Sequence, residues 1–167
     1  MAHLDADPSR DDALYRRRHS LAHVLAQAVL ELRPDAELGF GPPVEHGFYY
    51  DFRFAAPFEE SELGEVERRM RRILKRPARF ERSEMAWDEA AASLEQRGQP
   101  FKAEYARDLH ATQGVERISF YTSGPFVDMC EGPHVESTLD IPADTFQLDA
   151  VAGAYWRGSE HNPMMTR

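Results

Sequence analysis

Three imidazoles and one thiol occupy two short segments that lie far apart in the chain. His19 and His23 are spaced by four residues in the first segment, and Cys130 and His134 are spaced by four in the second. On a helix, residues spaced by four share a face and lie about one turn apart. A Gly-Pro pair between Cys130 and His134 predicts a tight turn, which would allow both side chains to point inward.

These four side chains could support two kinds of chemistry. Three histidines and one cysteine make a tetrahedral zinc set. The same groups could equally form a metal-free pocket that holds and polarises a water molecule. Each half of the set also has a purely structural interpretation, since a single cysteine is commonly a small buried hydrophobic residue.

The first pair of imidazoles requires a helix, and the sequence predicts one over residues 13–32. Leucine and valine recur there at steps of three and four, with Asp11 or Asp12 as the N-cap and Pro34 shortly after the end. Residues 38–52 contain several Gly and Pro, and the aromatic run at 48–54 is typical of a strand in a hairpin or meander.

The remaining elements are predicted from periodicity and from turn residues. Runs of helix and strand without regular βαβ alternation indicate the α+β class. We expect helices at 59–76, 87–97 (with Gly98 as its C-terminal cap) and 101–110, and strands at 80–85, 117–122, 126–129 and 145–156.

Composition sets the outer limits. The chain has 167 residues with a net charge of −9, which disfavours a protein that coats nucleic acid without specificity but leaves room for a local basic surface. No apolar run reaches the roughly 18 residues of a membrane span, so we expect no membrane partner. One cysteine excludes an internal disulfide framework and favours the cytoplasm. Residues 1–12 are expected to form a flexible lead-in rather than a signal peptide.

Longer motifs accompany the two half-motifs. The segments at 47–51, 126–134 and 152–158, together with His19, His23, Cys130 and His134, resemble the second additional domain shared by threonyl- and alanyl-tRNA synthetases and free-standing alanyl-tRNA deacylases. They are most similar to the threonyl type, over about residues 15–167. The resemblance implies an α+β fold in which an antiparallel sheet curves around a long N-terminal helix. It implies an editing domain at 13–167, with a helical sub-lobe at 58–112 as an option.

The resemblance also implies an activity, the hydrolysis of serine wrongly attached to threonine tRNA. Serine lacks one methyl group of threonine, and such a difference supplies only about 1–3 kcal/mol of discrimination, so a second, hydrolytic site is needed. Because no ATP-binding or amino-acid-activating motif is present, we expect the chain not to charge tRNA. Its expected partners are the serine-bearing acceptor end of tRNA(Thr) and the rest of the synthetase, including its catalytic domain.

The resemblance assigns roles to individual residues. The imidazoles and thiol of the two half-motifs surround the attacking water and the ester. Lys102 matches a family lysine near the ester and would stabilise the oxyanion or hold the terminal adenosine. Asp128 would face the same side of its strand as Cys130 and contact the serine amino or hydroxyl group. Tyr50 would line the pocket. Arg16, Arg17 and Arg18 are next to His19 in the sequence, so we expect them to adjoin the pocket and contact the tRNA.

Two alternatives and a metal question accompany this hypothesis. The chain could be a non-catalytic module that binds the tRNA 3′ end, or a free-standing zinc-dependent aminoacyl-tRNA deacylase. Alanyl-specific relatives bind zinc through these positions, whereas the threonyl type is generally thought to work without it. We therefore expect no required cofactor; if zinc is bound, its ligands would be His19, His23, Cys130 and His134.

Overall fold

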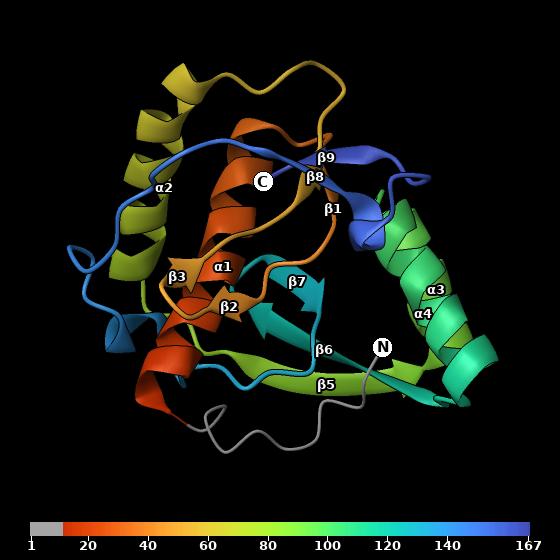
Figure 1. Ribbon diagram of the computed structural model, residues 1–167. Helices are drawn as coiled ribbons and strands as arrows, with labels where there is room; N and C mark the ends of the chain where they lie inside the picture. Colours follow the sequence, from red (N-terminus) through yellow and green to blue (C-terminus); the bar gives the residue numbers. More distant parts are fainter. Residues whose placement is uncertain (1–11) are drawn as a thin grey trace.

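The computed structural model describes residues 12–167, so most of the predicted lead-in lies outside the described residues (Figure 1). The first described element is α1, Ala13–Leu32, as predicted. Asp12 is its N-cap, and the Asp12 side chain accepts a hydrogen bond from the Leu14 backbone nitrogen at 3.0 Å. Ten of its residues are buried, including His19 and His23, so α1 runs through the interior of the fold.

The other elements are short, apart from three helices and two strands. In chain order they are β1 (Glu37–Leu38), β2 (Pro43–Val44), β3 (Gly47–Phe48), β4 (Phe52–Arg53), α2 (Leu63–Lys75), β5 (Glu81–Ala86), α3 (Trp87–Gln96), α4 (Pro100–Gln113), β6 (Arg117–Ser123), β7 (Phe126–Met129), β8 (Gly153–Tyr155) and β9 (Met164–Thr166). Short 3₁₀ turns lie at Glu60–Glu62, Thr138–Asp140 and Trp156–Gly158.

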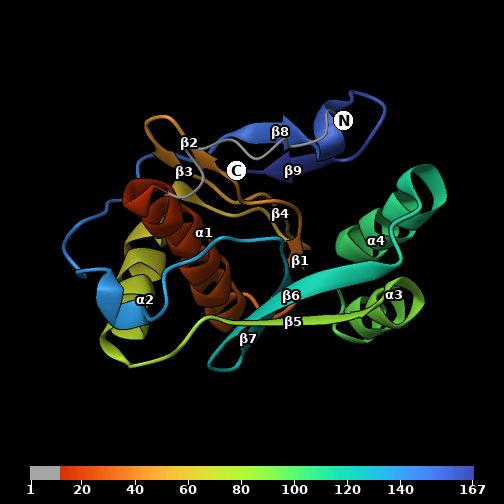
Figure 2. The same cartoon turned by 90° about the horizontal axis from the view of Figure 1, so that it is seen from below.

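Within residues 12–167, all strand pairs are antiparallel and form three sheets, which confirms the α+β class. Their strand orders are β1-β4-β9-β8, β2-β3 and β5-β6-β7. Figures 1 and 2 show the sheets arranged around α1, with α2 alongside it and the α3–α4 pair at the opposite end of the molecule. Among residues 12–167, no helix is long and apolar enough to cross a membrane.

Two main hydrophobic clusters stabilise the fold. The first joins α1 and α2 to the strands β1 and β4, with Val24, Leu38, Val66 and Met70 at its centre. The second packs α3 and α4 against the β5–β7 sheet through residues such as Phe120. The helices of segment 58–112 thus divide between the two clusters. The limits 13–167 for the editing domain stay a prediction.

One predicted strand is wrong. Of the segment 145–156, only Gly153–Tyr155 is a strand, pairing with β9, which the sequence did not indicate. Phe146 is buried in the first cluster, while the backbone nitrogen of Leu148 donates to the Glu67 side chain on α2 at 3.2 Å. This segment therefore follows the surface of α2 as irregular chain, because a side chain takes the hydrogen bond that a strand would need.

Candidate active site

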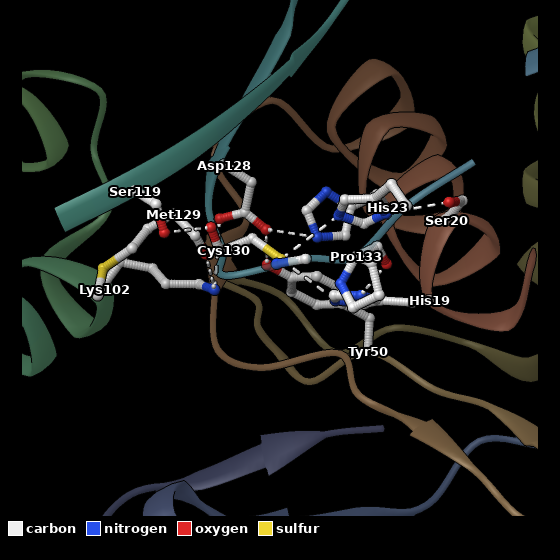
Figure 3. Close-up of polar contacts among 12 residues, drawn as sticks. His19, Ser20, His23, Tyr50, Lys102, Ser119, Asp128, Met129, Cys130 and Pro133 are labelled. Carbon is white, nitrogen blue, oxygen red and sulfur yellow. Dashed lines mark hydrogen bonds and ion pairs between the residues drawn. The ribbon is translucent and has the colours of Figure 1, made fainter. Parts of the chain in front are cut away.

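The two half-motifs meet at one point. His19 and His23 lie on the buried face of α1, Cys130 follows the end of β7, and His134 comes after a turn. The candidate ligand atoms of these four side chains all lie within 4.8 Å of one another. Figure 3 shows the labelled His19, His23 and Cys130 converging from helix and strand end. The convergence predicted from the spacing is therefore found.

The thiol lies at the centre of this cluster. Cys130 Sγ is 3.2 Å from His19 Nε2 and 3.4 Å from His134 Nε2. The Gly132 backbone nitrogen donates a hydrogen bond to the same sulfur at 3.2 Å. The turn therefore does more than reverse the chain, since its amide also fixes the thiol.

Two features of that turn, its backbone conformation and its packing, require glycine at position 132. Its φ of +76° lies in the left-handed region that favours glycine. A Cβ at this position would lie 2.3 Å from the Tyr121 hydroxyl oxygen, so no side chain fits without movement of that ring. Tyr121 also packs edge-on against His134 at a ring-centroid distance of 4.5 Å. Backbone conformation and close packing thus both hold the second half-motif.

A buried charged group borders the cluster. Asp128, on β7, accepts a hydrogen bond from the Tyr50 hydroxyl at 2.6 Å through Oδ2. The Lys102 ammonium is 3.3 Å from Asp128 Oδ1 and donates to the Met129 carbonyl at 3.2 Å. Asp128 Oδ1 is buried and accepts no hydrogen bond from the described residues. His23 Nε2 lies 3.7 Å from Oδ2, which connects Asp128 to the imidazoles.

A cleft of about 690 Å³ opens onto these groups. The three sequence segments predicted to supply the pocket, around Tyr50, Lys102 and Asp128–Cys130, all line it. His19 and His23 also line the cleft, whereas His134 is not among the described residues that line it. His134 is therefore on the inner side of the thiol. The cleft is also lined by Phe40, Tyr105, Trp156, Arg157 and Arg167, among others.

Burial keeps three members of the cluster uncharged, namely His23, Cys130 and His134. Desolvation, and then the neighbouring imidazoles, hold the pKa of His23 well below its ordinary value of 6.5. Burial likewise lowers the pKa of His134 to about 2 and raises the pKa of the Cys130 thiol to about 12. Burial also raises the pKa of Asp128, an effect that Lys102 and Tyr50 oppose. At neutral pH His23 and His134 are therefore neutral imidazoles, and Cys130 is a neutral thiol.

The donor set also fits zinc. Two ligands on a tetrahedral zinc ion with Zn–S and Zn–N distances of about 2.3 and 2.0–2.1 Å would lie about 3.5 Å apart, close to the 3.2 and 3.4 Å between Cys130 Sγ and the two Nε2 atoms. Zinc would be held by Cys130 and the three imidazoles and would supply a Lewis acid. Its binding would have to displace the thiol proton. The sulfur–nitrogen distances fit hydrogen bonds equally well.

The three arginines predicted to bind tRNA differ in their surroundings. Arg18 donates to the Val44 and Glu45 carbonyls at 3.1 and 2.6 Å, which ties α1 to the β2–β3 hairpin. Arg17 is exposed and Arg16 is half-buried. Contact of these residues with tRNA stays a prediction.

The motifs did not reveal three residues that shape the site. Ser20 contacts His134, Ser119 donates to the Cys130 carbonyl at 2.7 Å, and Gly41 lies so close to Tyr50 that a Cβ would be 2.2 Å from its ring. Ser20 carries one available signal, because it is a polar residue on the apolar part of a predicted helix. The other two depend on contacts between distant segments.

The comparisons with known proteins agree with this geometry. Residues 118–167 match the family model described as the threonyl and alanyl tRNA synthetase second additional domain. This part of the chain is therefore similar to that family, and the resemblance seen in the motifs is confirmed.

The relatives that align along nearly the whole chain are threonine–tRNA ligases. The chain is 42% identical over 164 residues to that of Borreliella burgdorferi (strain ZS7), 49% over 150 residues to that of Acetivibrio thermocellus and 48% over 157 residues to that of Gluconacetobacter diazotrophicus. The alignments cover 98, 90 and 94% of this chain. The chain spans about a quarter of the length of these relatives, with coverages of 27, 23 and 24%.

Proposed function

We propose that this chain is the post-transfer editing module of a threonyl-tRNA synthetase and hydrolyses the ester of seryl-tRNA(Thr). The observation that carries the proposal is the convergence of three imidazoles, a thiol, a lysine and a carboxylate beside a cleft. The similarity to threonine–tRNA ligases supports tRNA and the rest of a synthetase as partners.

Ester hydrolysis needs a group that removes a proton from water. His19 and His23 line the cleft, and the lowered pKa of His23 keeps its ring neutral and able to accept a proton at neutral pH. The raised pKa of Cys130 keeps the thiol protonated, so it serves as a hydrogen-bonding group rather than as a nucleophile. The proposal is therefore direct attack by water.

The lysine and the carboxylate would handle the charges of the substrate. The Lys102 ammonium lies beside the cleft and supplies a cation for the oxyanion that develops on the carbonyl oxygen. Asp128 Oδ1 is paired with the Lys102 ammonium at 3.3 Å and has no other partner among the described residues, so it keeps a lone pair for the serine amino or hydroxyl group. Tyr50 orients Asp128 through their 2.6 Å hydrogen bond.

The test is the release of serine from seryl-tRNA(Thr) by the purified chain. A His19→Ala, His23→Ala double variant should hydrolyse about 100-fold more slowly or worse, since general acid–base catalysis typically contributes 10²–10⁴-fold. His46→Ala is the matched control, because His46 is exposed on the turn between β2 and β3 and lies outside the cluster. Threonyl-tRNA(Thr) should resist hydrolysis by all three proteins.

Binding without catalysis is the competing hypothesis. It predicts that the unmodified chain binds tRNA but releases no more serine than the double variant does, and that result would reject the hydrolase. The cytoplasmic location also stays a proposal, supported by a single cysteine held as a half-buried neutral thiol.

A further inference from the structure

A fully buried serine contacts the cluster from its inner side. Ser20 follows His19 on α1 and is 0% exposed. Its Oγ lies 3.0 Å from His134 Nδ1 and 3.0 Å from the Val135 backbone nitrogen. Because His134 does not line the cleft, as judged over the described part of the chain, its contacts with Ser20 and Cys130 define its role.

The hydroxyl hydrogen of Ser20 has one acceptor. The Val135 N–H can only donate, so Ser20 Oγ accepts that hydrogen bond. Within residues 12–167, the other polar contact of Ser20 is with His134 Nδ1. Donation from the hydroxyl requires a lone pair on Nδ1, so a neutral His134 carries its hydrogen on Nε2.

The same reasoning gives His19 the opposite tautomer. The Pro133 carbonyl, 3.0 Å from His19 Nδ1, can only accept, so Nδ1 carries the hydrogen and the neutral ring has a lone pair at Nε2. Cys130 Sγ lies between the Nε2 atoms of His19 and His134. The S–H therefore donates to His19, while the sulfur accepts from His134 Nε2–H and from a backbone amide of the turn.

We infer that Ser20 is a positioning residue that fixes His134 as the Nε2–H tautomer, at the start of a directed chain of hydrogen bonds through Cys130 to His19. Every donor in this chain meets an acceptor, which is the condition for a stable buried polar network. The inference deepens the proposed function and rests on it for the identity of the group that accepts a proton from water. It makes His134 a donor to the thiol and occupies both ring nitrogens of His19, so that His23, of the two imidazoles that line the cleft, is left to accept the proton of water.

The test is the tautomer of His134 in the metal-free protein. Long-range ¹H–¹⁵N spectra of chelator-treated protein, labelled with ¹⁵N at histidine, distinguish a ring nitrogen that carries hydrogen from one with a lone pair. A His134→Gln variant assigns the signal. The unmodified chain should show hydrogen on Nε2, and Ser20→Ala should move the signals toward a mixture of tautomers or toward Nδ1–H.

Ser119→Ala is the matched control. This variant also removes one serine hydroxyl, which donates a hydrogen bond to the Cys130 carbonyl. Because that hydrogen bond does not involve an imidazole, His134 should keep its hydrogen on Nε2. A hydrogen on Nδ1 in the unmodified chain, or a Ser20→Ala spectrum that matches it, would overturn the inference. If Ser20→Ala does not fold, the spectrum of the unmodified chain decides alone. None of these spectra depends on ester hydrolysis, so failure here is separable from failure of the proposed function.

Discussion

At the scale of single residues, the hydroxyl of Tyr50 and that of its neighbour Tyr49 should differ in importance. Tyr50 is 1% exposed and donates to the buried Asp128, whereas Tyr49 is half-buried with the Arg167 guanidinium 3.8 Å above its ring. Tyr50→Phe would leave a buried carboxylate oxygen without its donor, which costs about 1–3 kcal/mol. Tyr49→Phe should change the free energy of unfolding by less than about 0.5 kcal/mol. Equal losses in urea unfolding would contradict this assignment.

Metal dependence is also decided by residues. The hydrogen bonds between Cys130 and the two Nε2 atoms satisfy the cluster without an ion, so we predict that chelation leaves seryl-tRNA hydrolysis within about twofold of its untreated rate. Elemental analysis of protein purified without chelator should find no zinc above the level of a Cys130→Ser variant. Stoichiometric zinc that is lost in Cys130→Ser, together with activity lost on chelation, would reject the prediction.

The sequence predicted which residues form the candidate site better than it predicted which of them contact one another. The four-residue spacings brought out His19, His23, Cys130 and His134, because local geometry determines which side chains share a face. The bond from Ser20 to His134 spans 114 positions of sequence. Such a contact depends on how α1 packs against the turn, which a single sequence does not express.

At the scale of elements, one prediction concerns the stability effect of replacing the glycine in the turn after β7. Gly98 and Gly132 have nearly the same positive φ, +74° and +76°, but a Cβ at Gly98 would meet open space and one at Gly132 would meet Tyr121. Gly98→Ala should cost about 1–2 kcal/mol from conformation alone. Gly132→Ala should cost about 1–3 kcal/mol more, because the added methyl group overpacks the site. Equal losses of unfolding free energy would show that Tyr121 moves aside freely.

Elements with strong local signals were predicted well, and those defined by distant partners were not. Residues 13–32 carry both helical periodicity and a capping aspartate, and they form α1 with the predicted bounds. The segment 145–156 has strand-like residues, yet only Gly153–Tyr155 pairs with another strand, and Phe146 is instead buried in the first hydrophobic cluster. Strand β9 has only three residues and pairs with β8 and β4, so tertiary context defines it.

At the scale of the whole molecule, the site lies where the two hydrophobic clusters meet. The first cluster includes residues of α1, the helix that carries His19 and His23, and the second includes residues of α4, which carries Lys102. Strand β7, which carries Asp128, contributes to both clusters. Relative movement of the two clusters would separate the imidazoles from Lys102. The buried groups of the site are therefore coupled to global stability, and the pH dependence of unfolding should report on them.

We predict that the metal-free protein loses stability as the pH falls below about 6.5. The unfolded chain then binds protons at His23 and His134, whereas the folded chain does not, since burial lowers both pKa values. Each imidazole should contribute a loss approaching about 1.4 kcal/mol per pH unit, until the pH nears its folded pKa. The raised pKa of Asp128 acts in the opposite direction, because the folded state keeps a proton that the unfolded state has released. Two imidazoles should outweigh one carboxyl group.

Urea unfolding at pH 7.5, 6.5 and 5.5 measures this dependence. His134→Gln removes one of the two imidazoles, so its stability should fall less steeply below pH 6.5, by up to about 1.4 kcal/mol per pH unit. His46→Gln should keep the original slope, because that imidazole is 89% exposed. If His134→Gln and the unmodified chain had the same slope, His134 would take up protons equally in both states. The folded protein would then not keep His134 neutral in this pH range, contrary to the neutral cluster on which the proposed water activation depends.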